Sequence, residues 1–144
     1  MSARMQVLSA LLVASAGASQ AAQYTLIDIG RFSGNQFGTT TVTDINNRGE
    51  VVGYSYDNTG NAAFVYSGGT MHNLRASLAP FGTALGSHLA VTHSFANSIN
   101  DSGLVVGYTQ YADPTAAFTW QNGTVTNLGS HNNWAWAPKG VNNR

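Results

Sequence analysis

The chain has 144 residues, only 8% of them are charged, and its six basic and six acidic side chains balance to a formal net charge of zero. A surface without a basic face releases few counterions from nucleic acid, so we expect no nucleic-acid partner. The chain contains no cysteine, so disulfides cannot stabilise it, and we expect its stability to come from sheet pairing and stacked apolar faces.

Residues 1–22 are predicted to be a signal peptide. Arg4 supplies positive charge, residues 7–14 form an apolar stretch too short to span a bilayer, and small residues follow, with cleavage expected after Ala21 or Ala22. The sequence therefore predicts export to the cell surface or extracellular space, with the periplasm as an alternative, and no transmembrane span in the mature chain. The alternative interpretation of this segment is an N-terminal core helix.

Beyond this segment the sequence repeats itself. Residues 45–54 read Ile-Asn-Asn-Arg-Gly-Glu-Val-Val-Gly-Tyr, and residues 99–108 read Ile-Asn-Asp-Ser-Gly-Leu-Val-Val-Gly-Tyr, 54 positions later. A third copy begins with Val-Asn-Asn-Arg at residues 141–144, so the pattern predicts an array of similar units. The predicted organisation is a signal peptide at 1–22, an N-terminal strand and connecting loop at 23–40, unit 1 at 41–96 with a loop insertion at 75–84, unit 2 at 97–138, and the start of a truncated unit 3 at 139–144.

Each unit is predicted to form four short antiparallel strands in meander order. In unit 1 the strands are expected at 41–45, 50–56, 62–67 and 70–74, separated by clusters of turn residues. Between the third and fourth strands, Gly-Gly in unit 1 and Asn-Gly in unit 2 readily take the positive φ angles of a two-residue type I′ turn. The residues expected to hold the turns are Gly49, Gly68, Gly69, Gly103, Asn122 and Gly123.

The predicted fold class is all-β, a partial β-propeller-like array of about two complete units, preceded by a signal helix and an orphan strand at residues 24–30. One unit cannot cover both of its own faces, so neighbouring units are expected to bury apolar positions between them. These positions are Val51, Phe64 and Tyr66 in unit 1 and Val105, Phe118 and Trp120 in unit 2. Because closure takes about four blades or more, the chain is expected to be a fragment or a prematurely ended product.

The order of these motifs, Ile-Asn-Asn-x-Gly-x-Val-Val-Gly, then Ala-Phe-x-Trp or Tyr, then Asn-Gly-Thr and a Leu-Gly ending, resembles the HAF-repeat family of exported bacterial proteins. The resemblance covers the chain from Tyr24 onward. The histidine that gives the family its name is replaced by Ala62 in unit 1 and by Ala116 in unit 2. The resemblance implies a signal peptide and export, but it assigns no activity, because the biochemistry of the family is largely undefined.

Candidate metal and catalytic groups are sparse. The histidines lack the close spacing of a helical zinc motif, so turn hydrogen bonds or solvation are favoured for them. They are His72, His88, His93 and His131. The stretch at 57–61 reads Asp-Asn-Thr-Gly-Asn and resembles a calcium loop, but its counterpart in unit 2 keeps one carboxylate, which favours turn chemistry. The six carboxylates form no recognisable catalytic pair, and we predict no catalytic residue, no metal and no cofactor.

Two tryptophans are the remaining functional hint. Trp134 and Trp136 follow unit 2 in a loop, where exposed rings could stack on a sugar or anchor a protein partner. Their alternation also fits a strand with at least one ring packed in a core. They are the possible ligand-contact residues.

The sequence predicts a non-enzymatic exported repeat protein, a structural or ligand-binding module of the cell surface or extracellular space. One alternative is a carbohydrate-binding module or polysaccharide-active enzyme that uses the loop aromatics, with a surface polysaccharide or a protein as partner. The other is a truncated gene product without independent function.

Overall fold

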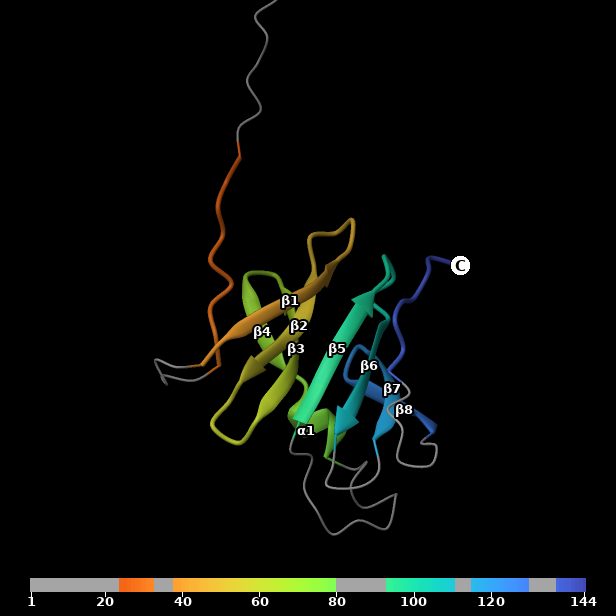
Figure 1. Cartoon of the computed structure of the whole chain (residues 1–144). Helices are drawn as coiled ribbons and strands as arrows, with labels where there is room; N and C mark the ends of the chain where they lie inside the picture. The colour runs from red at the N-terminus through yellow and green to blue at the C-terminus, as the bar shows by residue number, and fades with distance from the viewer. Residues whose placement is uncertain (1–23, 33–37, 80–92, 111–114, 130–136) are drawn as a thin grey trace, which may run out of the picture.

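A computed structural model describes residues 24–32, 38–79, 93–110, 115–129 and 137–144. These residues include two four-stranded antiparallel sheets (Figure 1). Sheet 1 consists of β1 (Thr40–Ile45), β2 (Val51–Tyr56), β3 (Asn61–Ser67) and β4 (Thr70–Asn73). Sheet 2 consists of β5 (His93–Ile99), β6 (Val105–Gln110), β7 (Ala116–Gln121) and β8 (Thr124–Gly129). The predicted all-β class and the meander order of both units are confirmed. Unit 1 and unit 2 below mean the parts of the chain that carry sheet 1 and sheet 2.

The third and fourth strands of each sheet are joined by a tight turn. Gly68 and Gly69 have φ angles of 58° and 81°, and Asn122 and Gly123 have φ angles of 49° and 84°. Both central residues of each turn therefore lie in the left-handed region that a type I′ turn requires, where glycine and asparagine are tolerated best.

Gly123→Val should lower the free energy of unfolding by more than about 1 kcal/mol, because a β-branched side chain is strained at positive φ. Beyond the chain neighbours, a Cβ at this glycine would meet no heavy atom within 4 Å, so the cost would come from the backbone. Thermal unfolding followed by circular dichroism measures the effect, with Gly123→Asn as the matched control. An unchanged Tm for the valine variant would contradict the turn assignment.

The first strand of each sheet carries a β-bulge at the same position of the repeat. The pairing of β1 with β2 shifts at Thr43, and the pairing of β5 with β6 shifts at Asn97. A bulge leaves one residue outside the ladder and re-aims its side chain. Both bulged residues use this freedom to reach the following part of the chain.

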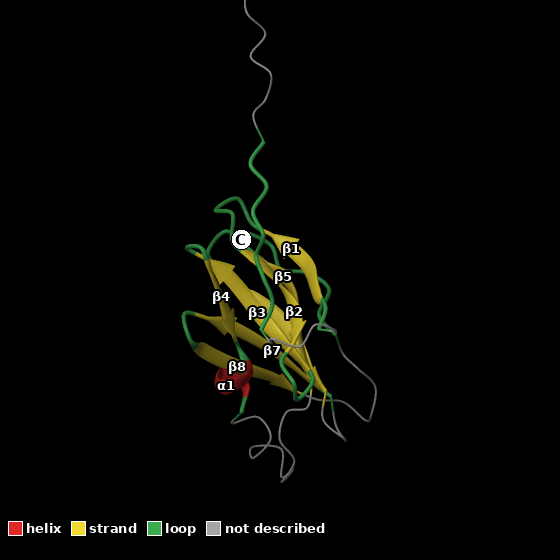
Figure 2. Ribbon diagram, turned by 90° about the vertical axis from the view of Figure 1, so that its left-hand side faces the viewer, coloured by secondary structure: helices red, strands yellow, loops and turns green. Residues whose placement is uncertain are grey.

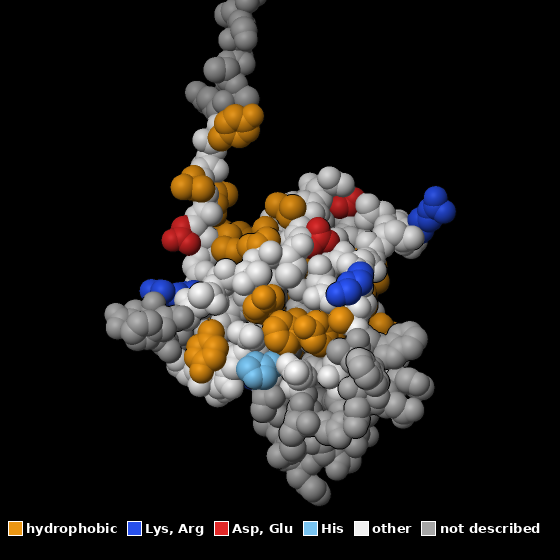
Figure 3. All heavy atoms as spheres, viewed as in Figure 1, with side chains coloured by type: hydrophobic (Ala, Val, Ile, Leu, Met, Phe, Trp, Pro, Cys, Tyr) orange, Lys and Arg blue, Asp and Glu red, His pale blue; other side chains and the backbone are white. Residues whose placement is uncertain are grey.

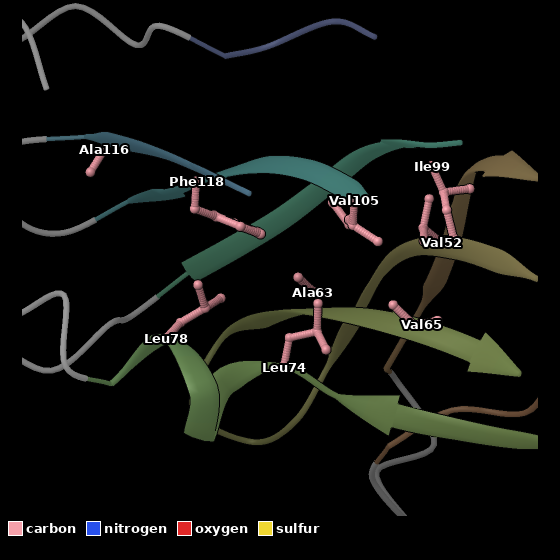
Figure 4. Close-up of a cluster of buried hydrophobic side chains, with 10 residues drawn as sticks. Val52, Ala63, Val65, Leu74, Leu78, Ile99, Val105, Ala116 and Phe118 are labelled. Carbon is pink, nitrogen blue, oxygen red and sulfur yellow. The ribbon is translucent and has the colours of Figure 1, made fainter. Parts of the chain in front are cut away.

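The core lies between the two sheets, because β5 packs across β1, β2 and β3. Apolar side chains from both units meet there (Figure 4). Its buried members are Val52, Ala63, Val65, Leu74, Leu78, Ala96, Ile99, Val105, Ala116 and Phe118. Each large side chain buried in this way contributes about 1.5–3 kcal/mol, so each unit is stabilised by its neighbour.

The predicted interface positions are buried to different extents. Phe64, Val105 and Phe118 are fully buried, whereas Val51, Tyr66 and Trp120 are only partly buried. Val51 and Val105 are equivalent in the repeat, but Val105 belongs to the core between the sheets. Val51 lies on the opposite side of sheet 1, where no other sheet of the described chain packs against it.

Two expectations are not met. Residues 24–30 form no strand. A fourth strand needs the edge of a third strand, and β3 and β7 already have neighbours on both sides. The predicted loop insertion begins with a helical turn, α1 (Arg75–Leu78), which lies beside β8 (Figure 2). Leu78 is fully buried and, with Leu74 four residues earlier, closes the outer edge of the core.

The described part of the chain contains no helix that is long and apolar enough to cross a membrane. The predicted signal helix lies outside the described residues.

Candidate functional site

The junction between units is built on the Ile-Asn-Asx-x-Gly turn that the sequence repeats. In unit 1, Asn46 Oδ1 accepts hydrogen bonds from the backbone N–H of Arg48 and of Glu50, both at 3.0 Å. Asn100 Oδ1 accepts the equivalent bonds in unit 2 from Ser102 at 3.0 Å and Leu104 at 2.9 Å. Asparagine suits this position because its short side chain replaces backbone partners within a turn.

The amide nitrogen of the same asparagine connects one unit to the next. Asn46 Nδ2 donates to the carbonyl oxygen of Asn100 at 3.0 Å. Asn100 Nδ2 donates to the carbonyl oxygen of Asn142 at 2.9 Å. These two side chains are 9% and 8% exposed, so the bonds replace solvation that the amides have lost.

The following residue supplies a second connection. The carboxylate of Asp101 accepts hydrogen bonds from the backbone and the side chain of Asn47, at 2.9 and 2.8 Å, and from Asn143 Nδ2 at 2.8 Å. The bond from the Asn47 backbone, the bonds from the two amides and the charge of Arg48 hold the pKa of Asp101 below its usual value. One carboxylate therefore joins three consecutive copies of the turn.

The bulged residue supplies a third connection. Thr43 Oγ1 donates to the carbonyl oxygen of Ala96 at 2.7 Å. Asn97 Nδ2 donates to the carbonyl oxygen of Pro138, the equivalent position in the next copy, at 2.6 Å. The donor is a hydroxyl in Thr43 and an amide in Asn97, but both side chains donate a hydrogen bond to the same backbone position of the following copy.

A fourth connection involves Asp44 and its equivalent Ser98. Asp44 Oδ2 accepts from Ser98 Oγ at 2.7 Å and from Ile99 N at 3.0 Å, and Ser98 Oγ accepts from Val141 N at 3.3 Å. Burial by itself raises the pKa of Asp44, but its hydrogen bonds, including one from Ile45 N, outweigh burial and lower the pKa. We call these four connections the junction ladder. Residues 137–144 thus contact unit 2 through the same repeat positions by which unit 2 contacts unit 1.

Asp57 belongs to a different structural cluster, an ion pair with Arg75. The guanidinium donates to the two carboxylate oxygens at 2.6 and 2.9 Å, and both side chains are mostly buried. Thr59 and Asn73 donate to the same carboxylate. Burial alone raises the pKa of Asp57, but the bonds from Arg75, Thr59 and Asn73 together lower it to about 2. The oxygens considered for calcium are therefore bound by a cation of the chain itself.

The Asp57–Arg75 pair should make the free energy of unfolding depend on pH. The pKa of Asp57 is about 2 when folded against an ordinary value of 3.8, so its stabilisation is complete above about pH 5 and is lost as the pH falls toward about 2. The size expected is about 2 kcal/mol. Urea unfolding of the wild type and of Asp57→Asn across this range measures it. A difference between the two proteins that stays constant as the pH falls would contradict this assignment.

An open cavity of about 360 Å³ lies where the outer parts of the two units meet. Its lining includes Arg48, Glu50, His72 and Trp120. Arg48 and Glu50 form an ion pair at 2.6 Å, and the buried Trp120 Nε1 has no hydrogen-bond partner among the described residues. Burial by itself raises the pKa of Glu50, but hydrogen bonds from Arg48, Asn46 and Ser67 and the charge of Arg48 lower it.

A cluster of aromatic side chains bridges the two units. The ring of Phe95 stacks on Tyr108 at a centroid distance of 4.8 Å and meets Tyr54 edge-on at 4.9 Å. The ring of His93 also stacks with Phe95, at a centroid distance of 6.3 Å. All four side chains are partly exposed. The partial burial of Tyr108 raises the pKa of its hydroxyl, and the charge interaction with the neighbouring Tyr54 raises this pKa further. In Figure 3 hydrophobic side chains gather beside a histidine over the area of β5.

The structure brings together few of the residues singled out in the sequence. Trp134 and Trp136, with His88 and His131, lie outside the described residues. His93 Nδ1 accepts a hydrogen bond from Asn61 N at 3.1 Å, and His72 is exposed on β4. No group of three or more His, Asp or Glu side chains in the described ranges is placed to hold a metal ion.

The junction ladder and the aromatic cluster were missed in the sequence. For the ladder a signal existed, since polar residues recur at the bulge and turn positions of each copy. For the aromatic cluster there was no such signal, because its central residue, Phe95, is not repeated. The equivalent position in unit 1 is Thr41.

Comparisons with protein-family models, with curated proteins and with solved structures gave no match for this chain.

Proposed function

We propose that the chain is a non-enzymatic, exported repeat module that presents a continuous surface of stacked sheet units. The observation that carries this proposal is the junction ladder, whose bonds join residues 137–144 to unit 2 as they join unit 2 to unit 1. A bond pattern that recurs at successive junctions is typical of an array in which each unit binds only its neighbours. A propeller-like arrangement of such units is the form we favour.

The carboxylates support a structural role. A general acid at neutral pH needs a raised pKa. The pKa values of Asp44, Glu50, Asp57 and Asp101 are all lowered by hydrogen bonds from neighbouring residues. Each of these groups stabilises a turn, a junction or a loop.

Export is tested by expressing the whole chain in a bacterial host, separating the cell fractions and measuring the mass of the product. We expect a mature chain that begins at Ala22 or Gln23, outside the cytoplasm. A full-length product that stays in the cytoplasm would contradict export.

Carbohydrate binding is the second candidate function, and the aromatic cluster favours it. Partly exposed rings from two units lie side by side on one surface, and aromatic faces stack on the apolar faces of sugars. Glycan-array screening of the wild type, Phe95→Ala and Trp134→Ala tests this candidate. The matched control is Tyr24→Ala, since Tyr24 is 92% exposed and lies outside the cluster. Binding that is lost in Phe95→Ala or Trp134→Ala but kept in the control would establish it.

A further inference from the structure

The side of sheet 1 that faces away from unit 2 has the residues of a junction, but no unit among the described residues packs on it. We call it the free face. Val42 and Ile45 lie on it and are 51% and 61% exposed. Their equivalents in unit 2, Ala96 and Ile99, face sheet 1 and are 0% and 5% exposed. The same positions are therefore buried wherever a preceding unit is present.

The neighbouring N-terminal segment covers part of the free face. Phe32 meets Phe64 edge-on at 6.3 Å, and Phe32 N donates to Ser55 Oγ. Tyr24 and Leu26 in the same segment are more than nine-tenths exposed, and Figure 3 shows hydrophobic side chains where this segment approaches β1. Exposed apolar surface of this kind marks an interaction site.

We propose that the free face binds a second copy of this chain, head to tail, with unit 1 of one copy packed on unit 2 of the other. The contact continues the interface that the two units already form within one chain. It goes beyond the proposed function, which requires only contacts between units of one polypeptide.

The identity of the turns is the chemical reason for a second copy. Residues 45–48 read Ile-Asn-Asn-Arg. Residues 141–144, which bind to the turn of unit 2, read Val-Asn-Asn-Arg. Asn100 and Asp101 therefore find the same partners in unit 1 of a second copy as in residues 141–144. When residues 45–48 of a second copy replace residues 141–144 on unit 2, these bonds are kept, and the side chains of Val42 and Ile45 are buried in addition.

The polarity of the ladder makes the contact head to tail. The carbonyl oxygen of Asn100 accepts from Gly103 N in its own turn and from Asn46 Nδ2 of the preceding unit. The equivalent carbonyl of Asn46 accepts from Gly49 N in its own turn and, within the described chain, from no preceding unit. Its partner in the contact is the Asn100 amide of the other copy.

Residues 137–144 compete with the second copy, because they are attached to the chain that they bind. Such attachment gives a local concentration in the millimolar range. Weakening this segment should therefore strengthen association between chains.

Sedimentation velocity from about 5 to about 300 µM tests the proposal. The wild type should associate weakly, and Asn143→Ala, alone or with Val141→Asp, should associate at a concentration lower by about tenfold. Adding Ile45→Lys or Val42→Lys to Asn143→Ala should restore the monomer. Ala76→Lys is the matched control, because Ala76 is exposed on α1 and lies off the free face, so it should leave association unchanged.

The thermal transition of each variant shows whether it is folded. A folded Asn143→Ala chain that stays monomeric throughout the range would overturn the proposal and leave the face to a different polypeptide. Association that Ile45→Lys and Val42→Lys weaken no more than Ala76→Lys does would overturn it as well.

Discussion

Gly107→Val should lower the free energy of unfolding by about 3 kcal/mol or more. A Cβ on Gly107 would lie 2.2 Å from the carbonyl oxygen of Phe95 and 2.7 Å from Cζ of Phe118. The first neighbour is backbone held in the β5–β6 ladder, and the second is a fully buried ring, so neither can move away at low cost.

Urea unfolding followed by circular dichroism measures this loss. Gly140→Ala is the matched control, since a Cβ there would meet no atom within 4 Å beyond the chain neighbours, and it should change stability little. Gly53 is the equivalent in unit 1, where a Cβ would lie 1.9 Å from the carbonyl oxygen of Thr41. Wild-type stability in Gly107→Val would show that the bulged strand β5 does not lie against β6 in this register.

Asn100→Ala should cost about 2–4 kcal/mol, because it removes several hydrogen bonds that a nearly buried side chain makes to the backbone. The side chain is 8% exposed. Its oxygen accepts from the backbone of Ser102 and Leu104, and its nitrogen donates to the carbonyl of Asn142. Alanine removes both the support of the turn and the bond across the junction.

Asn100→Asp separates the two roles. Aspartate keeps an acceptor for Ser102 and Leu104 but has no donor for the carbonyl of Asn142. The carboxylate should therefore preserve the turn and weaken the hold on residues 137–144. Amide hydrogen exchange resolves the outcome, with faster exchange expected at Val141 and unchanged exchange at Leu104. Equal acceleration at both positions would contradict a distinct role for the amide nitrogen.

Local chemistry explains why the strands could be predicted. Residues 50–56 and 62–67 were expected as strands and are found at Val51–Tyr56 and Asn61–Ser67, bounded by glycine and asparagine at positive φ. The short helix α1 was not predicted, because its one buried side chain, Leu78, packs in the core that both units share. A single apolar residue does not produce the repeated apolar spacing by which a helix is recognised in a sequence.

The candidate site was harder to predict, because the bonds of the junction ladder join residues more than 40 positions apart. Asp57 was considered for calcium from its neighbours in sequence, yet its partner is Arg75, which a turn and a hairpin bring back to it. Phe95 meets Tyr54 only because β5 crosses sheet 1. The loop tryptophans Trp134 and Trp136 remain predictions outside the described residues.

The sequence by itself determined the four-stranded units and their turns, because glycine, asparagine and β-branched residues act on the backbone within a few positions. Only the tertiary structure decided how the units meet. Val51 and Val105 occupy the same place in the repeat, yet only Val105 is fully buried, since burial depends on which face a neighbour covers. The junction ladder likewise needs two copies of the turn to lie side by side. These copies are 54 positions apart in the sequence, so the conformational preferences of neighbouring residues cannot bring them together.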